Sequence, residues 1–258
     1  MMTKNRIREY TDFDDDSEKL INRENVWHFY AYFAGEAAQL LQEFLEIADI
    51  PEVSTRFIKV DDHPVEVVGR EQFDEIMDAF GLLIDYYKGT TDHYYHESFE
   101  YNGREIDFER GDTIVSLLDS LHLFVNILPY LNRRHYVLSK GRYDEIRYHR
   151  FSFDELQHLD RTLAKAILPT FVWFAEHSIF SPQYFKRMFN YPKPSNKTDS
   201  SFWSYNQWSN ALATMVTSWE WLKDRKNDGC KDGWEQVTDE IYYGLHLFAE
   251  YLPEMQND

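Results

Sequence analysis

The chain has 258 residues, of which 43% are hydrophobic and 17% aromatic, so it carries enough apolar side-chain area for a core that folds unaided. Its 45 acidic and 27 basic residues give a net charge of −18. Phosphate repels a molecule of this charge, which disfavours direct nucleic-acid binding by the chain as a whole. The acidity either serves a basic surface on a protein partner or only keeps the protein soluble.

The acidic excess is local, because positions 36–120 hold 21 acidic and 6 basic residues. Cys230 is the only cysteine, so an intrachain disulfide is excluded, and secreted domains more often carry paired cysteines. The first residues lack the apolar segment of a signal peptide, and no stretch approaches the roughly 18 apolar residues of a membrane span. We therefore expect a cytoplasmic protein without membrane association.

In chain order, residues 1–17 are polar and predict a flexible N-terminal arm. A helix is expected over 17–49, ended by Pro51, and short strands or irregular structure over 53–68. The helical stripe of this first helix consists of Phe33, Ala37, Leu40, Leu41 and Phe44.

The next two helices have the strongest apolar periodicity in the chain. One covers 73–87 with Gly89 as its C-terminal cap, and the other covers 114–128, with Asp112 capping its start and Pro129 stopping it. Between them, Asn102–Gly103 is flanked by alternating residues, which predicts a β-hairpin over about 98–108 with a type I′ turn.

The C-terminal half predicts further helices. Ser152 and Glu155 form a capping box for one helix, which Pro169 is expected to bend or interrupt. A short helix after Ser181 and a polar loop over 190–201 follow. The last two amphipathic helices are built on Trp208, Leu212, Met215, Val216, Trp219 and Leu222 and on Trp234, Val237, Ile241, Leu245, Phe248 and Leu252.

These elements predict a mainly α fold, a multi-helix, bundle-like packing of amphipathic helices with one inserted β-hairpin at about 98–108. The division of charge suggests an acidic helical lobe over 18–130 and a second helical lobe over 131–258 packed on it. No segment between them has the composition of a flexible linker, so a single domain is the alternative.

Catalytic motifs with a known mechanism are missing: the sequence has no phosphate-binding loop, dinucleotide fingerprint, zinc-protease helix or nucleophile elbow. No cofactor is predicted, and a divalent metal is kept as an alternative. Its candidate ligands are His93, His96 and Glu97, and the pairs Glu155–His158 and Asp119–His122 have the three-residue spacing of carboxylate–histidine sites.

Basic and aromatic residues alternate between positions 133 and 150, and the guanidinium and ammonium groups there suit phosphates or nucleotides. The competing interpretation is that these groups neutralise the acidic half across an internal interface. The basic residues are Arg133, Arg134, Lys140, Arg142, Arg147 and Arg150.

A binding surface for a protein partner has two kinds of candidate residue. Asp74, Glu75 and Asp78 lie within the acidic region, and Trp203 and Trp221 lie off the apolar stripes of their helices. Exposed tryptophans are favoured anchors at protein interfaces, although they also cover cores as partly buried lids.

Residues 150–178 (RFSFDELQHLDRTLAKAILPTFVWFAEHS), the Tyr191–Pro192 turn and the spacing of Trp208, Leu212, Met215 and Trp219 resemble a group of uncharacterised phage-encoded helical proteins. The resemblance covers 150–223. The chain departs from it at Gln157, where the group tends to have tryptophan, and in a longer loop before Trp208. The resemblance implies a phage origin and carries no catalytic residues with it.

Together these features predict a non-enzymatic, acidic phage protein that acts in the host-cell cytoplasm. It would bind a host or viral protein, with inhibition of a nucleic-acid-binding host defence enzyme as the best fit to its charge. A metal- or nucleotide-dependent enzyme with a His/carboxylate site and a structural virion component that forms homo-oligomers are the alternatives.

Overall fold

The computed structural model describes residues 28–52, 55–60, 63–92, 98–101, 104–107, 111–131, 136–177, 205–224 and 239–255. This part of the chain is mostly helical, which confirms the predicted fold class at that level. The predicted arm over 1–17, the short helix after Ser181 and the loop over 190–201 fall outside the described residues. Among the described helices, none combines the length and the apolarity needed to cross a membrane.

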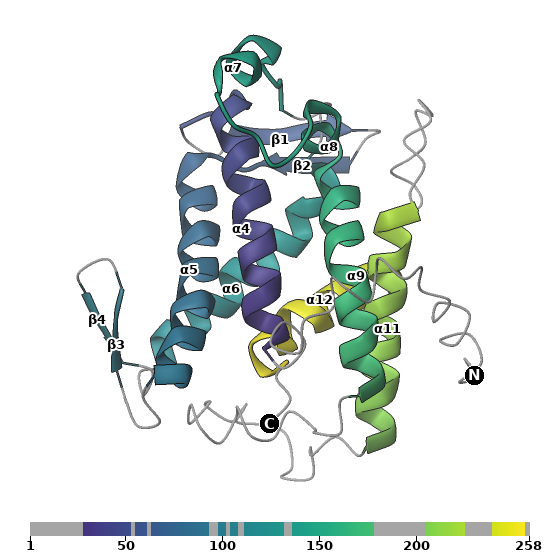
Figure 1. The fold of residues 1–258 in the computed structure, drawn as a ribbon. Coiled ribbons are helices and arrows are strands. Elements are labelled where there is room, and N and C mark those ends of the chain that lie inside the picture. Colours follow the sequence, from purple (N-terminus) through teal and green to yellow (C-terminus); the bar gives the residue numbers. More distant parts are fainter. Residues whose placement is uncertain are drawn as a thin grey trace.

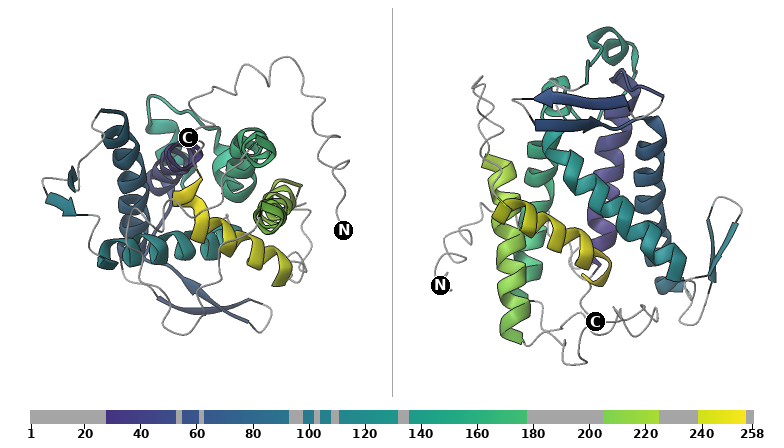
Figure 2. Two further views of the ribbon diagram at one scale, coloured as in Figure 1. Left: turned by 90° about the horizontal axis from the view of Figure 1, so that it is seen from below. Right: turned by 180° about the vertical axis from the view of Figure 1, so that it is seen from behind.

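The longer helices form two layers (Figures 1 and 2). One layer contains α5 (Arg70–Asp92), α4 (Phe29–Ile47), α9 (Leu159–His177) and α11 (Tyr205–Asp224), side by side in that order. The second layer contains α6 (Gly111–Ile127) and α12 (Asp239–Tyr251), which pack on each other and cross the first layer at a slant. Because α5 packs on α6 and α11 on α12, these six helices form a closed circuit.

Short elements sit at the ends of these layers. They are α7 (Lys140–Glu145), α8 (Phe153–Gln157) and the 3₁₀ turns η1 (Leu128–Tyr130) and η2 (Leu252–Glu254). Strands β1 (Thr55–Val60) and β2 (His63–Val67) pair antiparallel, as do β3 (Ser98–Tyr101) and β4 (Arg104–Asp107). The predicted turn at Asn102–Gly103 and the side chains of these strands lie outside what is described, so the hairpin with a type I′ turn stays a prediction.

Phe33 of α4 lies at the centre of the core, where its ring meets an aromatic ring from each of four other helices. These rings, with their centroid distances from Phe33, are Phe80 of α5 (6.1 Å), Phe124 of α6 (6.4 Å), Trp219 of α11 (5.7 Å) and Phe248 of α12 (4.9 Å). One turn earlier, Phe29 stacks on Phe171 of α9 at 4.9 Å. Described helices from both predicted lobes therefore share one hydrophobic core.

Most described residues of the predicted apolar stripes are buried, whereas Trp234 and Val237 of the last stripe lie outside the described residues, and several predicted helix ends are wrong. The 3.6-residue period places Phe33, Phe73 and Trp219 in the core as expected. However, α5 continues through Gly89 to Asp92 instead of ending there, and α6 begins before Asp112, which lies in its first turn. Apolar periodicity defines which face of a helix is buried, and it carries less information about where the helix stops.

Helix α4 ends at Ile47, four residues before the predicted stop at Pro51. Ala48 adopts an extended conformation and forms a β-bridge with Leu138. The amide of Ser139 donates to the Ile47 carbonyl (2.8 Å), and the amide of Asp49 donates to the Val137 carbonyl (2.9 Å). A segment distant in sequence thus pairs with the end of α4 and determines its length, which local sequence patterns cannot anticipate.

The interruption predicted at Pro169 occurs instead at His158. Helix α8 ends at Gln157, His158 follows as its cap with a φ of −130° outside the helical range, and α9 then continues through Pro169 to His177. Proline removes one amide donor from a helix, and neighbouring groups can compensate for the loss. The carbonyl that loses its amide donor is that of Lys165, and the hydroxyl of Tyr32 donates to the adjacent Ala166 carbonyl at 2.9 Å.

Candidate functional site

The outer face of α5 carries acidic side chains in the described part of the acidic region. Asp74, Glu75 and Asp78 are exposed, while Phe73 and Ile76 of the same helix are buried against α4 and α6. The structure therefore brings the three predicted partner-binding carboxylates together on one solvent-facing helix surface. We refer to Asp74, Glu75 and Asp78 as the α5 acidic face.

Glu36 and Glu43 of α4 and Asp49 just after it are placed differently, because the described part of the basic segment, 136–150, lies on them. Nη2 of Arg150 is 2.8 Å from each of the two carboxylate oxygens of Glu36, so one nitrogen contacts both oxygens. Arg142 reaches the Asp49 carboxylate at 2.5 Å and the Ala48 carbonyl at 3.3 Å. For these two arginines the geometry supports the internal, charge-neutralising interpretation.

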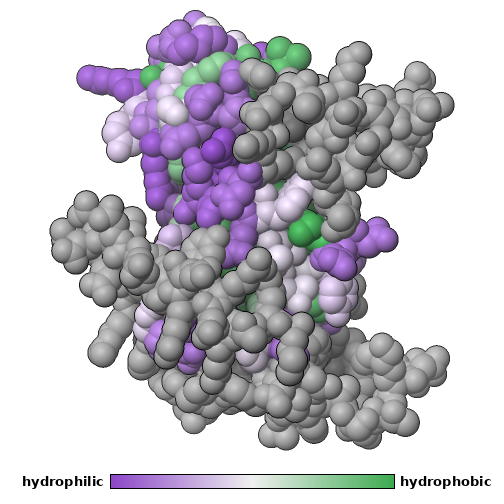
Figure 3. All heavy atoms as spheres, turned by 90° about the vertical axis from the view of Figure 1, so that its right-hand side faces the viewer, coloured by the Kyte–Doolittle hydropathy of each residue, from purple (hydrophilic) through white to green (hydrophobic). Residues whose placement is uncertain are grey.

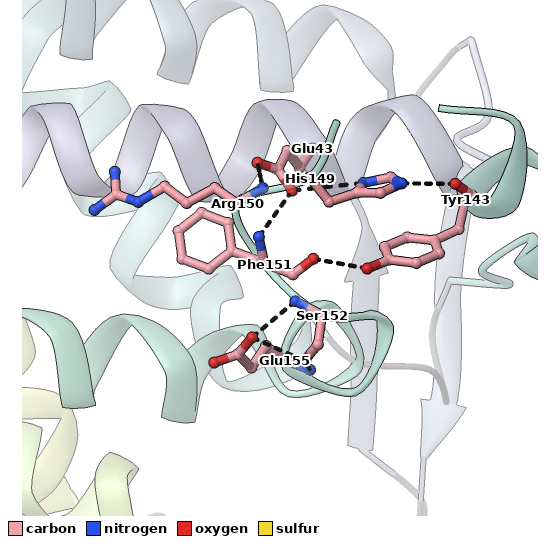
Figure 4. A network of polar contacts seen from close by, with 7 residues as sticks. All are labelled: Glu43, Tyr143, His149, Arg150, Phe151, Ser152 and Glu155. Carbon is pink, nitrogen blue, oxygen red and sulfur yellow. Dashed lines mark hydrogen bonds and ion pairs between the residues drawn. The ribbon is translucent and has the colours of Figure 1, made fainter. Parts of the chain in front are cut away.

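Glu43 is the centre of the contact between this basic segment and α4 (Figure 4). Its carboxylate accepts hydrogen bonds from the backbone amides of Arg150 (3.0 Å) and Phe151 (3.2 Å) and lies 3.9 Å from Nδ1 of His149. The other ring nitrogen of His149 is 2.6 Å from the Tyr143 carbonyl, and the two rings stack with centroids 3.7 Å apart. Since Glu43 is half-buried, it acts as a fixed acceptor that holds the chain between α7 and α8 against α4.

Replacing Glu43 with glutamine is expected to lower the free energy of unfolding by about 1–3 kcal/mol, because the amide removes the charge and one of two acceptor oxygens from a half-buried site. Thermal or urea unfolding measures this loss. Glu46→Gln, one turn further along α4 at an exposed position, is the matched control and should change stability by less than about 0.5 kcal/mol. Equal effects of the two substitutions would contradict the role assigned to Glu43.

Helix α8 uses the capping box that the sequence predicts. The Ser152 hydroxyl accepts from the amide of Glu155, and the Glu155 carboxylate accepts from the amide of Ser152 at 2.7 Å. These hydrogen bonds to the Ser152 backbone and hydroxyl lower the pKa of Glu155. The carboxylate is therefore occupied as a cap, which argues against the predicted Glu155–His158 metal pair.

The remaining predicted residues are scattered. Lys140 pairs with Asp144 on the surface of α7, Arg147 is exposed, and Trp221 is half-buried against the core. Within the described ranges, no group of three or more His, Cys, Asp or Glu side chains is arranged to hold a metal ion. Predicted residues that lie outside these ranges are His93, His96, Glu97, Arg133, Arg134 and Trp203.

Sequence reasoning missed Glu43 and His149, which organise the contact between α4 and the basic segment. Glu36 and Glu43 are two helical turns apart, so they lie on one face of α4. This spacing is the feature of the sequence that could have pointed to Glu43. Comparison of the chain with protein family models, with curated proteins and with solved structures gives no match.

Proposed function

We propose that the protein binds a basic surface of another protein through the α5 acidic face. The observation that carries this proposal is a difference in contacts: the acidic residues on and just after α4 contact the described part of the basic segment, whereas Asp74 and Glu75 of α5 do not. Glu36, Glu43 and Asp49 are occupied by the basic segment, whereas Asp74 and Glu75 are exposed and form no ion pair with any side chain that the structure describes. Exposed, unpaired carboxylates on a rigid helix attract a cationic partner and orient its approach.

The negative charge of the α5 acidic face indicates which class of partner it binds. Figure 3 shows the opposite side of the molecule, beside α11, where the described surface is mainly hydrophilic, with only small, separate hydrophobic areas. On α5 a charged contact is favoured over an apolar one because its exposed residues include Asp74, Glu75 and Asp78. A row of carboxylates resembles the phosphates of a nucleic-acid strand in charge, so a groove that binds nucleic acid is the most suitable basic surface. The resemblance to phage-encoded proteins supports a host enzyme, such as a defence nuclease, as the owner of that groove.

Reversing the α5 acidic face with Asp74→Lys, Glu75→Lys and Asp78→Lys is expected to abolish binding, with affinity falling by about 100-fold or more, because like charges then face each other. The tagged chain is expressed in host cells, purified and examined by native mass spectrometry. A stoichiometric mass increment that corresponds to one host protein is expected for the wild-type chain. Calorimetry with that protein should show affinity falling as salt is raised.

The matched control reverses three other exposed acids, Glu52, Glu145 and Glu240, which lie on separate parts of the molecule and give the same change in net charge. This variant should retain the partner, since the proposal depends on position and not on total charge. Retention of the partner by the α5 variant would overturn the proposal. A metal or nucleotide increment on an otherwise bare chain would support the enzyme alternative, and a homo-oligomer alone would support a structural role.

A further inference from the structure

The contact between α6 and α12 contains a cluster of polar side chains. The rings of His122 on α6 and His246 on α12 lie 5.0 Å apart and are tilted by 34°. Nε2 of His246 is 2.7 Å from the side-chain oxygen of Asn126, and the hydroxyls of Tyr130 and Tyr242 share a hydrogen bond. We call these five residues the α6–α12 seam.

The hydrogen bonding at His122 suits a neutral imidazole. Since the Asn126 oxygen is an acceptor, His246 carries its proton on Nε2 and donates it there. Nδ1 of His122 is buried and has no hydrogen-bond partner among the described residues. A proton added to that nitrogen would be a buried donor without an acceptor, and two protonated rings 5.0 Å apart would repel each other.

The groups around His122 shift its pKa in opposite directions. Burial and the neighbouring His246 lower the pKa of His122, while Glu250 of α12 and Asp119 of α6 oppose them. On its other side, α6 packs on α5 through apolar rings such as Phe80 against Phe124. Because the pKa of His122 is lowered overall, His122 takes up a proton at a lower pH in the folded protein than in the unfolded chain.

We propose that the α6–α12 seam is an acid-sensitive latch, in which protonation of His122 beside His246 weakens the packing of α12 on α6. The direction of the pH dependence follows from the difference between the folded and unfolded pKa of His122. A histidine with a lowered pKa contributes its full stability above the unfolded pKa of about 6.5 and loses it as the pH falls below that value. The latch is therefore closed at neutral pH and weakened at mildly acidic pH. It does not depend on the α5 acidic face.

Hydrogen exchange measured by mass spectrometry at pH 7.5 and pH 5.5, corrected for the intrinsic pH dependence of exchange, tests the latch in the full chain. Protection of α12 and of the α12-facing turns of α6 should fall at pH 5.5, while α4 and α9 stay protected. In the double variant His122→Phe with His246→Gln this acid loss should disappear. Phenylalanine fills the site without titrating, and the glutamine amide can still donate to Asn126.

Thermal unfolding gives a second measurement. Between pH 7.5 and 5.5 the wild-type Tm should fall by up to about 4 °C more than that of the double variant, because only the unfolded chain gains the proton freely in this range. If the double variant does not fold, the single variant His246→Gln replaces it in this comparison. His177→Gln, which removes an exposed imidazole at the end of α9, should leave the acid loss unchanged. Equal loss of α12 protection in wild-type and seam variants, or no loss in the wild type, would overturn the latch.

Discussion

Phe33→Ala is expected to lower the free energy of unfolding by about 3–5 kcal/mol, the largest effect of any substitution considered for this protein. The ring is 1% exposed and meets aromatic rings from α5, α6, α11 and α12, so its removal leaves a cavity where these helices converge. None of them can move inward to fill the cavity without losing contacts with its other neighbours. Urea unfolding followed by circular dichroism measures the loss.

Phe33→Leu is the matched control for this prediction, because leucine retains most of the buried volume. Its cost should be about 1–2 kcal/mol, so the difference between the two variants reports the cavity. Because Phe33 links helices from both predicted lobes, the wild-type chain should also unfold in one transition. A loss below about 1 kcal/mol for Phe33→Ala, or two separate transitions in the wild type, would show that the helices do not depend on this shared centre.

Gly244→Ala should destabilise the protein by about 2–3 kcal/mol, although alanine is the better helix former. A Cβ atom at this position of α12 would lie 2.0 Å from the Ser218 hydroxyl and 2.8 Å from the Thr214 carbonyl, both on α11. The carbonyl belongs to the backbone, so the two helices would have to separate. Thermal unfolding, with circular dichroism to check helix content, measures the effect.

Gly35→Ala is an internal control with the opposite sign. A Cβ atom there meets nothing within 4 Å, so the substitution should stabilise α4 by up to about 1 kcal/mol through helix propensity alone. Adding Ser218→Ala to Gly244→Ala should restore only part of the lost stability, since the Thr214 carbonyl remains. If Gly244→Ala were as stable as Gly35→Ala, the close approach of α11 and α12 would be wrong.

The fold was predictable where one short stretch of sequence holds the whole signal. The apolar stripe that includes Phe73 and Phe80 identifies a helix and its buried face without reference to the rest of the chain. The capping box of Ser152 and Glu155 is equally local, and it forms as predicted. In contrast, the end of α4 is determined by pairing with Leu138, which no pattern near Ile47 reveals.

The polar contacts were harder to predict because each joins residues distant in sequence. Glu43 contacts the segment that contains His149, and His122 meets His246, across separations that periodicity does not address. The arginines between 133 and 150 admitted two interpretations until Arg142 and Arg150 could be placed on α4. A count of charges also treated the acids of α4 and α5 as one group, whereas tertiary packing separates them.

The close approach of η2 to the start of α4 bears on how the chain can fold during synthesis. The amide of Tyr30 is 3.4 Å from the carbonyl of Met255, and both residues are completely buried. Helix α4 leaves the ribosome early, yet the surfaces that cover it on α9, α12 and η2 are made much later. Its aromatic stripe must therefore stay exposed, or be covered by a chaperone, until α12 and η2 have been synthesised, and a nascent chain that stalls before α12 would be prone to aggregate.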